Sequence, residues 1–379
     1  MSESWTRNIP LGTRVLAAMS GGVDSSVAAR RLVEAGFDVI GITMHLVPVE
    51  NRPKSGAQVS DEKSCCSLAA AEDARRVAAD IGIPHYMLNL ADEFEDKVMS
   101  PTRMEYARGR TPNPCVLCNR YMKFDVLFER AEQLGCTHVA TGHYARITED
   151  PDGLHLLRGV DSQKDQSYFL SFLTEYELER IIFPLGWNNK ESVREEAARI
   201  GLKVADRPES QDLCFFATGP IDSAGIRSEG NSGQIVLTDG TVVGEHNGIS
   251  GFTIGQRKGV PGGMPEKMYV VGINAEQNRV IVGKDEDLYS SGFSIDDISI
   301  VSDERGRRSL EGEVGVQVRY RAGVVKGNVN LQAGEVRLSK PVRAVTPGQA
   351  AVFYTGEEVI GGSTIDVVDP GERESLPGQ

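Results

Sequence analysis

The turn over residues 19–26 constrains the fold of this chain more than any other segment. It follows the apolar run of residues 15–18 and leads into a helical pattern that continues to Val33. Two adjacent glycines, Gly21 and Gly22, let the backbone approach an anion closely, and the amides of the next helical turn point at that anion. The order of strand, glycine turn and helix therefore predicts an α/β domain that binds a phosphate group.

The side chains of this turn narrow the class of phosphate site. The lysine of the common P-loop is missing. Ser20, Ser25 and Ser26 offer hydroxyl donors, and Asp24 would hold Mg²⁺ or orient the loop. The pattern Ser-Gly-Gly-x-Asp-Ser resembles the pyrophosphate loop of enzymes that cleave ATP to AMP and pyrophosphate. An ordinary turn before a helix is the alternative.

The bulk properties bound the class of protein. At 379 residues the chain is long enough for two or three domains, and no apolar run approaches the ~20 residues that cross a bilayer. The first residues have no apolar core of an export signal, so we expect a cytoplasmic protein without a membrane partner. The net charge of -13 argues mildly against nucleic acid, although a local basic face is enough for binding.

The first half of the chain alternates apolar runs with helical stretches. This alternation predicts a parallel sheet covered by helices, with ligands at the carboxyl ends of its strands. After the strand of residues 15–18, strands are expected at 38–44, 86–88 and 137–141, and helices at 67–81, 92–108, 119–134 and 174–200. Residues 45–64 are expected to form a loop.

The character of the chain changes after Ser210. Glycine becomes frequent, and short Val/Ile-rich runs recur at 269–273, 279–283 and 314–318. Such spacing predicts a small linking module followed by a β-barrel. The predicted domains are an ATP-binding α/β domain over 1–209, a small β-rich domain over 210–287 and a C-terminal β-barrel over 288–379.

The six cysteines are too few for a disulfide scaffold in a chain of this length. Cys115 and Cys118 precede a helix expected near Asn119, whose positive end would raise the thiolate fraction of Cys118. A single nucleophile, a redox pair and a structural zinc site all remain open, although the sequence offers no second pair of zinc ligands, and no metal site is predicted. Cys214 lies among apolar residues, as a core or a functional cysteine. Cys136 is expected in the core, and Cys65 and Cys66 are side by side.

Three further groups of residues are candidates for contacts with a ligand. Gly142 and His143 follow a predicted strand, so Gly142 should lie near the nucleotide and His143 is a candidate site residue. The run Lys164, Asp165 and Gln166 opens a predicted helix and suits contacts to phosphate or base. Arg319, Tyr320 and Arg321 alternate charge and ring on an expected strand.

Taken together, these segments resemble the bacterial tRNA-specific 2-thiouridylases, which place sulfur on the wobble uridine of tRNA. The resemblance is collinear over nearly the whole chain. The matching segments are residues 18–26, 109–114, 117–119, 140–144, 164–170, 255–259, 318–321 and 346–349. It implies a nucleotide-binding α/β domain, a small central domain and a C-terminal β-barrel.

The resemblance also implies roles for individual residues. Cys118 matches the nucleophile and Cys214 the persulfide-carrying cysteine, and the two would end the reaction as a disulfide. The implied ATP-binding residues are Ala18, Met19, Ser20, Gly21, Gly22, Val23, Asp24, Ser25, Met44 and Gly142. Those implied to meet the target base or the tRNA are Asn113, Pro114, Cys115, His143, Lys164, Asp165, Gln166, Arg319, Tyr320 and Gln349.

The implied reaction is an ATP-dependent 2-thiolation at position 34, in which AMP is transferred to the C2 oxygen and sulfur then replaces it. The implied partners are MgATP, the tRNAs for Lys, Glu and Gln, and a persulfide donor such as a cysteine desulfurase or a sulfur-relay protein. Cys115 departs from the family pattern, because some members carry an aspartate there. Basic zones are expected around residues 103–123 and in the tail, at Arg319, Arg321, Lys340 and Arg343.

Two other classes of protein would share part of this pattern. An ATP-dependent amidating ligase would use ammonia and need neither Cys118 nor Cys214, and it would leave the β-rich tail unexplained. A nucleotide-sensing RNA-binding protein would bind ATP without releasing pyrophosphate.

Overall fold

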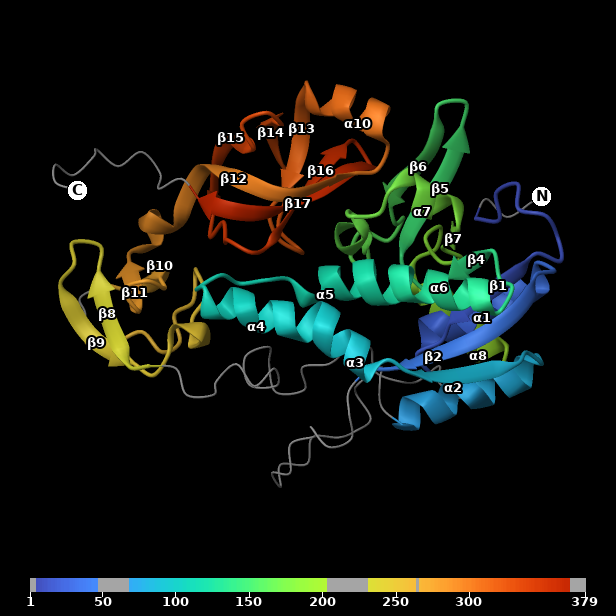
Figure 1. The fold of residues 1–379 in the computed structure, drawn as a ribbon. Coiled ribbons are helices and arrows are strands. Elements are labelled where there is room, and N and C mark those ends of the chain that lie inside the picture. Colours follow the sequence, from blue (N-terminus) through green and yellow to red (C-terminus); the bar gives the residue numbers. More distant parts are fainter. Residues whose placement is uncertain (1–4, 47–67, 203–230, 264–265, 369–379) are drawn as a thin grey trace. The chain divides into compact units, whose positions relative to one another are not determined.

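The structure, a computed structural model, describes residues 5–46, 68–202, 231–263 and 266–368 (Figure 1). The chain divides into two compact units. Unit 1 comprises residues 1–99, 114–219 and 357–359, and unit 2 comprises residues 100–113, 220–356 and 360–379. Cys65, Cys66, Cys214, most of the expected 45–64 loop and the end of the chain after residue 368 lie outside the described residues.

Unit 1 is built on a parallel sheet. Its strand order is β3-β2-β1-β4-β7, and the strands are β1 (Arg14–Ala18), β2 (Asp38–His45), β3 (His85–Asn89), β4 (His138–Ala140) and β7 (Ile181–Ile182). In β1 the consecutive residues Val15, Leu16 and Ala17 are all buried. Because successive side chains point to opposite faces, both faces of the sheet centre are covered, as a parallel sheet requires.

Helices α1 (Val23–Glu34), α2 (Leu68–Ile81) and α8 (Lys190–Arg199) share one apolar cluster with β1 and β2. Arg31 of α1 ties this layer together. Its guanidinium donates to both carboxylate oxygens of Glu196 on α8, at 3.0 and 2.5 Å, and to the side chain of Asn188 at 2.6 Å. Helix α6 (Leu127–Gln133) contacts β1 and β4.

One predicted helix is wrong. Residues 174–200 form a short helix α7 (Glu175–Glu179), strand β7 and helix α8 instead of a single helix. The physical reason is a tertiary one: Ile181 and Ile182 complete the edge of the sheet beside β4. Asn189 then starts α8 as an N-cap, since its side chain accepts a hydrogen bond from Ser192 N at 2.8 Å.

The other elements of unit 1 follow the predicted alternation with local differences. Strands β5 (Ala145–Asp150) and β6 (Gly153–Arg158) form an antiparallel hairpin that the sequence reading did not anticipate. The expected helix at 92–108 is divided into α3 (Ala91–Phe94), a π-helical segment η3 (Glu95–Met99) and α4 (Ser100–Ala107), the last of these in unit 2.

Unit 2 is mostly β-structure, as expected. A four-stranded sheet has the order β10-β11-β8-β9, with β8 (Gly233–Leu237), β9 (Val242–His246), β10 (Tyr269–Asn274) and β11 (Arg279–Gly283). A second set of strands closes into a six-stranded barrel, because β12 pairs with both β15 and β17. Its strands are β12 (Tyr289–Ile300), β13 (Glu313–Gln317), β14 (Val325–Asn330), β15 (Glu335–Arg343), β16 (Ala350–Thr355) and β17 (Glu358–Val368).

Each part of unit 2 has its own core. Val270, Val280 and Val282 are fully buried in the four-stranded sheet, and Phe353 and Ile365 are fully buried in the barrel. Helix α10 (Asp303–Leu310) packs Leu310 into the barrel core. The predicted fold class is confirmed, while the predicted domain boundaries stay predictions. None of the described helices has the length and apolar character needed to span a bilayer.

Candidate functional site

The glycine turn lies at the carboxyl end of β1, where the sequence predicts it. Gly22 is the N-cap of α1, and Gly21 has a φ of +70°, a conformation that favours glycine. A Cβ atom at Gly21 would lie 2.1 Å from the carbonyl oxygen of Ala70, at the start of α2. Position 21 therefore admits only glycine without a movement of the loop or of α2.

Hydroxyl groups close the turn onto the helix. Ser20 N donates to Ser25 Oγ at 3.1 Å, and Ser25 Oγ donates in turn to Gly22 O at 3.2 Å. Ser26 Oγ donates to the same carbonyl at 2.8 Å. Met19, the first residue of the turn, donates its N–H to Ile42 O in β2. The loop is thus shaped by its own serines and presents the first turn of α1, an arrangement suited to an anion.

Asp24 sits in a pair of strong polar contacts. Both its carboxylate oxygens accept hydrogen bonds from Lys190 Nζ, at 2.6 and 2.7 Å, and Tyr144 OH donates to Oδ1 at 2.8 Å. The Lys190 side chain is only 11% exposed. The charge of Asp24 is thereby compensated within the protein, and an ammonium group is held beside the phosphate loop.

Gly142 lies against the same loop. A Cβ atom on Gly142 would come within 3.0 Å of the backbone of Asp24 and Ser25. The predicted proximity of Gly142 to the phosphate loop is present in the structure, and its contact with a nucleotide stays a prediction.

His143 is buried beside this loop, and its ring is fixed on both sides. Lys123 Nζ lies 3.2 Å from Nε2 and Thr141 Oγ1 lies 2.7 Å from Nδ1. Since an ammonium group can only donate, Nε2 accepts and Nδ1 carries the proton. Burial, together with the charge of Lys123, holds the pKa of His143 well below its usual value. The ring therefore stays neutral, and its expected contact with tRNA remains a prediction that burial does not favour.

Cys118 and Met44 belong to one apolar cluster. Cys118 is 4% exposed and packs with Leu90 and Met122, and Met44, at the end of β2, lies against the same cluster. The structure thus brings the predicted nucleophile and a predicted nucleotide-binding residue into one region of unit 1.

The helix that carries Cys118 begins earlier than predicted. Helical backbone starts at Pro114, in α5 (Pro114–Leu117), and continues through a π-helical segment η4 (Cys118–Val126) into α6. Pro114 suits a first helical position because its missing N–H needs no partner there. The expectation that the helix starts near Asn119 is wrong, and the argument that the helix end activates the thiol of Cys118 fails with it.

Cys115 therefore occupies the first turn and is half-buried. Asn119, also buried, donates its side-chain amide to Cys115 O at 2.9 Å, which ties the first turn to the π-helical segment. Asn113 precedes the helix and belongs to unit 2, so the chain passes from one unit to the other between Asn113 and Pro114. Gln349, also in unit 2, hydrogen-bonds to the backbone just before Asn113.

In the run Lys164–Gln166, the side chains of Asp165 and Gln166 make hydrogen bonds within the protein. Asp165 Oδ1 accepts hydrogen bonds from the N–H groups of Gly159 and Ser167, both at 3.0 Å. Gln166 Oε1 accepts from Tyr144 N at 3.0 Å. These two side chains shape the turn before the short 3-10 helix η5 (Ser167–Leu170), and the tRNA contacts expected of this run stay predictions.

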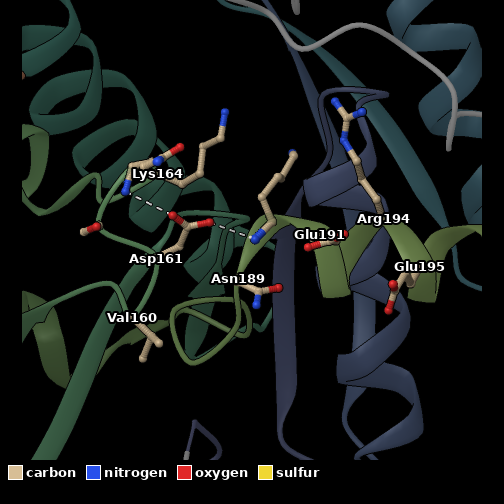
Figure 2. A pocket seen from close by; sticks show the side chains of 10 residues that line it. Val160, Asp161, Lys164, Asn189, Glu191, Arg194 and Glu195 are labelled. Atoms are coloured by element: carbon tan, nitrogen blue, oxygen red, sulfur yellow. Dashed lines mark hydrogen bonds between the residues drawn. The ribbon is translucent and has the colours of Figure 1, made fainter.

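Lys164 lines an open cleft of about 790 Å³ (Figure 2). Asp161 organises this cleft, because its Oδ2 accepts from Lys190 N at 2.9 Å. Its charged lining is mixed, with the cations Lys164, Lys190 and Arg194 and the carboxylates Asp161, Glu191 and Glu195. The lining therefore has no predominant charge.

Arg319, Tyr320 and Arg321 do not lie on a strand, contrary to expectation. They form a turn after β13, in which Ala322 N donates to Arg319 O at 3.1 Å and Arg321 has a φ of +63°. Arg319 and Arg321 are exposed, and the guanidinium of Arg321 lies 5.5 Å from the centre of the Tyr320 ring. A turn presents all three residues on one loop of the barrel, where a strand would have separated them onto two faces.

Lys190, Tyr144 and Lys123 were missed as site residues by sequence reasoning. Lys190 was hidden inside a predicted continuous helix. Pro184, Gly186 and the pair Asn188–Asn189 could have signalled the break and a new helix start. Among the residues that the structure describes, no group of three or more His, Cys, Asp or Glu side chains is arranged to hold a metal ion.

The parallel sheet, the glycine turn at the carboxyl end of its first strand, and the helix start behind it define a nucleotide-binding α/β protein of the pyrophosphate-loop class.

Comparison with known proteins specifies the family. Models described as a tRNA methyl transferase HUP domain, a tRNA methyl transferase PRC-barrel domain and an aminomethyltransferase beta-barrel domain match residues 13–218, 226–284 and 290–365. The tRNA-specific 2-thiouridylase MnmA of Geobacter metallireducens is 46% identical over 93% of this chain and 96% of its own length. That of Solibacter usitatus is 42% identical over 93% and 99%. The chain therefore belongs to the tRNA-specific 2-thiouridylase family, and the family and enzyme class predicted from the sequence are confirmed.

A solved structure of a 4-thiouridine synthetase in complex with RNA and ATP covers 55% of this chain and 46% of its own. Its sequence identity is 19% and its TM-score is 0.37.

Proposed function

We propose that this chain catalyses the ATP-dependent 2-thiolation of the wobble uridine of tRNA. The observation that carries the proposal is the 46% identity to a tRNA-specific 2-thiouridylase along 96% of that relative's length. The glycine turn with its helix start supports the use of ATP, and the buried Cys118 close to Met44 supports a role for a thiol near the nucleotide.

In the first step the C2 oxygen of the uracil, a poor leaving group, takes AMP from ATP and pyrophosphate departs. The residues from Ser20 to Ser25 hold the phosphates, and Mg²⁺ arrives with the nucleotide as part of the substrate. Lys190 assists here: its ammonium group, held by Asp24, lies beside the loop and stabilises negative charge on the departing pyrophosphate.

In the second step a persulfide on Cys214 supplies the sulfur. Its terminal sulfur either attacks C2 directly, after which Cys118 attacks the Cys214 sulfur, or Cys118 cleaves the persulfide and the released sulfide attacks C2. In a third order Cys118 first displaces AMP from C2, the terminal persulfide sulfur then displaces Cys118 from C2, and the freed Cys118 thiolate attacks the Cys214 sulfur. AMP leaves with the oxygen, C2 keeps the sulfur, and Cys118 and Cys214 end as a disulfide that two external thiols, or one dithiol, reduce by two electrons.

The partners in this proposal are the tRNAs for Lys, Glu and Gln and a persulfide donor such as a cysteine desulfurase or a sulfur-relay protein. Asn113, Pro114 and Cys115 would meet the target base, which must be unstacked from the anticodon loop. The exposed Arg319 and Arg321 would contact the tRNA backbone.

The test is mass spectrometry of tRNA nucleosides after incubation with ATP, Mg²⁺ and a sulfide source. We expect 2-thiouridine from the natural chain. The Cys214→Ser variant should give none, although it still releases pyrophosphate in the presence of tRNA, because adenylation precedes sulfur transfer. Cys136→Ser is the matched control, since Cys136 is a buried thiol whose pKa is raised by burial, and it should retain product formation.

Thiolated product from Cys214→Ser at the rate of the natural chain would overturn the assignment of the persulfide. Ammonia-dependent turnover that survives loss of both Cys118 and Cys214 would instead indicate an amidating ligase.

A further inference from the structure

The loop that precedes Asn113 is held by the barrel of unit 2. Thr111 N donates to Pro347 O at 2.8 Å. Gln349 Nε2 donates to Thr111 O at 2.9 Å and to Pro112 O at 3.3 Å. Because both acceptors are carbonyl oxygens, the side-chain amide must present its NH₂ group to them.

Gln349 is itself fixed in the barrel. Its backbone N donates to Thr346 O at 3.2 Å, and its carbonyl accepts from Ile365 N at 2.8 Å. The side chain therefore starts from a rigid point, which lets it fix a neighbouring backbone. It is half-buried, so it is not presented as an open surface group.

Gly348 brings the two backbones into direct contact. It has a φ of +90°, and a Cβ atom there would lie between 3.0 and 3.1 Å from backbone atoms of Thr111 and Pro112. The neighbouring Arg110 adds a second anchor, because it forms ion pairs with Glu105 and Asp366 and donates to Ile365 O.

The other side of this loop is held by the four-stranded module. The hydroxyl groups of Thr111 and Thr253 share a hydrogen bond. Gly109, with a φ of +75°, packs against Ile273 of β10, and a Cβ atom there would lie 2.6 Å from Ile273 Cγ2. The segment from Gly109 to Pro112 is thus clamped from two sides inside unit 2.

We propose that Gln349 is a positioning residue of the thiolation reaction: its side-chain amide sets the path of the Thr111–Pro112 backbone and thereby the place of Asn113. This inference rests on the proposed function. It differs from the tRNA contact that the sequence resemblance implies for Gln349, because the amide protons are directed at the protein's own backbone. The barrel then does more than bind tRNA, since it also fixes the loop that meets the base.

The experiment compares Gln349→Glu and Gln349→Met with Gln332→Glu, a matched charge change at an exposed position of the same barrel. Hydrogen exchange of the Thr111 amide is measured in the protein without tRNA. For the same variants we measure the dissociation constant for tRNA and the single-turnover rate of thiolation at saturating tRNA. Glutamate is isosteric with glutamine, but it turns a carboxylate oxygen toward two carbonyls.

We expect faster exchange at Thr111 in both Gln349 variants, about tenfold or greater loss of single-turnover rate, and a dissociation constant within about twofold of the natural chain. Gln332→Glu should match the natural chain in all three. Gly348→Ala, checked for folding by thermal melting, should repeat the pattern of the Gln349 variants without altering the amide.

A weaker tRNA affinity with unchanged exchange and unchanged saturated rate would overturn the proposal and make Gln349 a tRNA contact only. If the natural chain makes no 2-thiouridine, the proposed function fails. Hydrogen exchange of the Thr111 amide would still show whether Gln349 holds the loop.

Discussion

At the scale of single residues, the contacts of Asp24 and Lys190 determine how the phosphate loop is charged. An acidic side chain in a loop that receives phosphates would repel them. The ammonium of Lys190, 2.6 Å from Asp24 Oδ1, offsets that charge, and in the proposed reaction it stabilises the phosphates of the nucleotide.

Replacement of Lys190 by methionine should therefore lower pyrophosphate release in the presence of tRNA by about 100-fold or more, as loss of one preorganised charge often does. The Asp24 side chain is 35% exposed, so the loss in unfolding free energy should stay below the ~3 kcal/mol of a fully buried pair that loses one partner. The control is Arg194→Met, a cation from the same cleft that should keep pyrophosphate release. Full release by Lys190→Met would exclude this role.

His143, a candidate site residue from its position after β4, is buried in the structure. Its ring is enclosed by Phe124 and Phe183 and fixed by Lys123 and Thr141. Its contact with tRNA stays a prediction.

At the scale of elements, the junction between β1, α1 and α2 is the most constrained part of unit 1. Gly21 combines a left-handed backbone with contact against Ala70. The start of α2 therefore limits the shape of the phosphate loop, which links nucleotide binding to a helix that is distant in sequence.

The Gly21→Ala variant should lose ATP-dependent turnover and melt at a lower temperature, because a Cβ atom would meet the Ala70 carbonyl. Gly82→Ala separates the two causes: Gly82 has a φ of +78° with no atom within 4 Å of the added Cβ, so only backbone strain of about 1–2 kcal/mol is expected. Thermal melting and pyrophosphate release distinguish the variants. Equal loss of turnover in both would mean that contact with α2 does not matter.

The helical stretch from Pro114 to Gln133 is a second example of element-level design. Its centre is π-helical from Cys118 to Val126. Such segments are rare in proteins as a whole, and those that occur are often found at functional sites. Cys118, Met122 and Val126 follow one another at intervals of four residues and lie in one apolar cluster.

At the scale of the whole molecule, several of the arginines expected to form basic zones are neutralised. Arg108 pairs with Glu105, Arg110 with Glu105 and Asp366, and Arg343 with Asp285. Arg319, Arg321 and Lys340 are exposed in the barrel unit. The basic surface of the tail is therefore narrower than its sequence suggests.

Four of the six histidines respond to pH in the same direction. Burial lowers the pKa of His85, His143 and His246, and it lowers the pKa of His138 to about 4. At a pH between the pKa of these histidines in the folded protein and their unfolded pKa of about 6.5, the unfolded chain binds more protons than the folded protein does. The stability that these four histidines contribute is therefore full above pH ~6.5 and is lost as the pH falls below it.

Denaturant unfolding at pH 7.5 and pH 5.5 should show this loss. In His143→Asn the difference between the two pH values should shrink by about 1 kcal/mol, since one depressed histidine contributes about that much one unit below its unfolded pKa. His138→Asn should act in the same direction. An unchanged pH dependence in both variants would contradict the buried neutral state of these rings.

The sequence by itself determined the fold class, the phosphate loop and the family, because short segments of neighbouring residues carry the signals for all three. A strand, two glycines and a helix start lie within about a dozen neighbouring residues, and hydrophobic periodicity marks most strands and helices. Local sequence patterns gave wrong predictions for residues 174–200, for the start of the helix at Pro114 and for the turn at Arg319. At these places contacts with a neighbouring element determine the secondary structure.

Only the tertiary structure decided which distant groups meet. Lys190 reaches Asp24 across 166 positions and Gln349 reaches Thr111 across 238, and no sequence pattern records either contact. The physical reason is that strand pairing and core packing are non-local: they bring α8 to the phosphate loop and the barrel to the loop before Asn113, and side-chain chemistry then completes each contact.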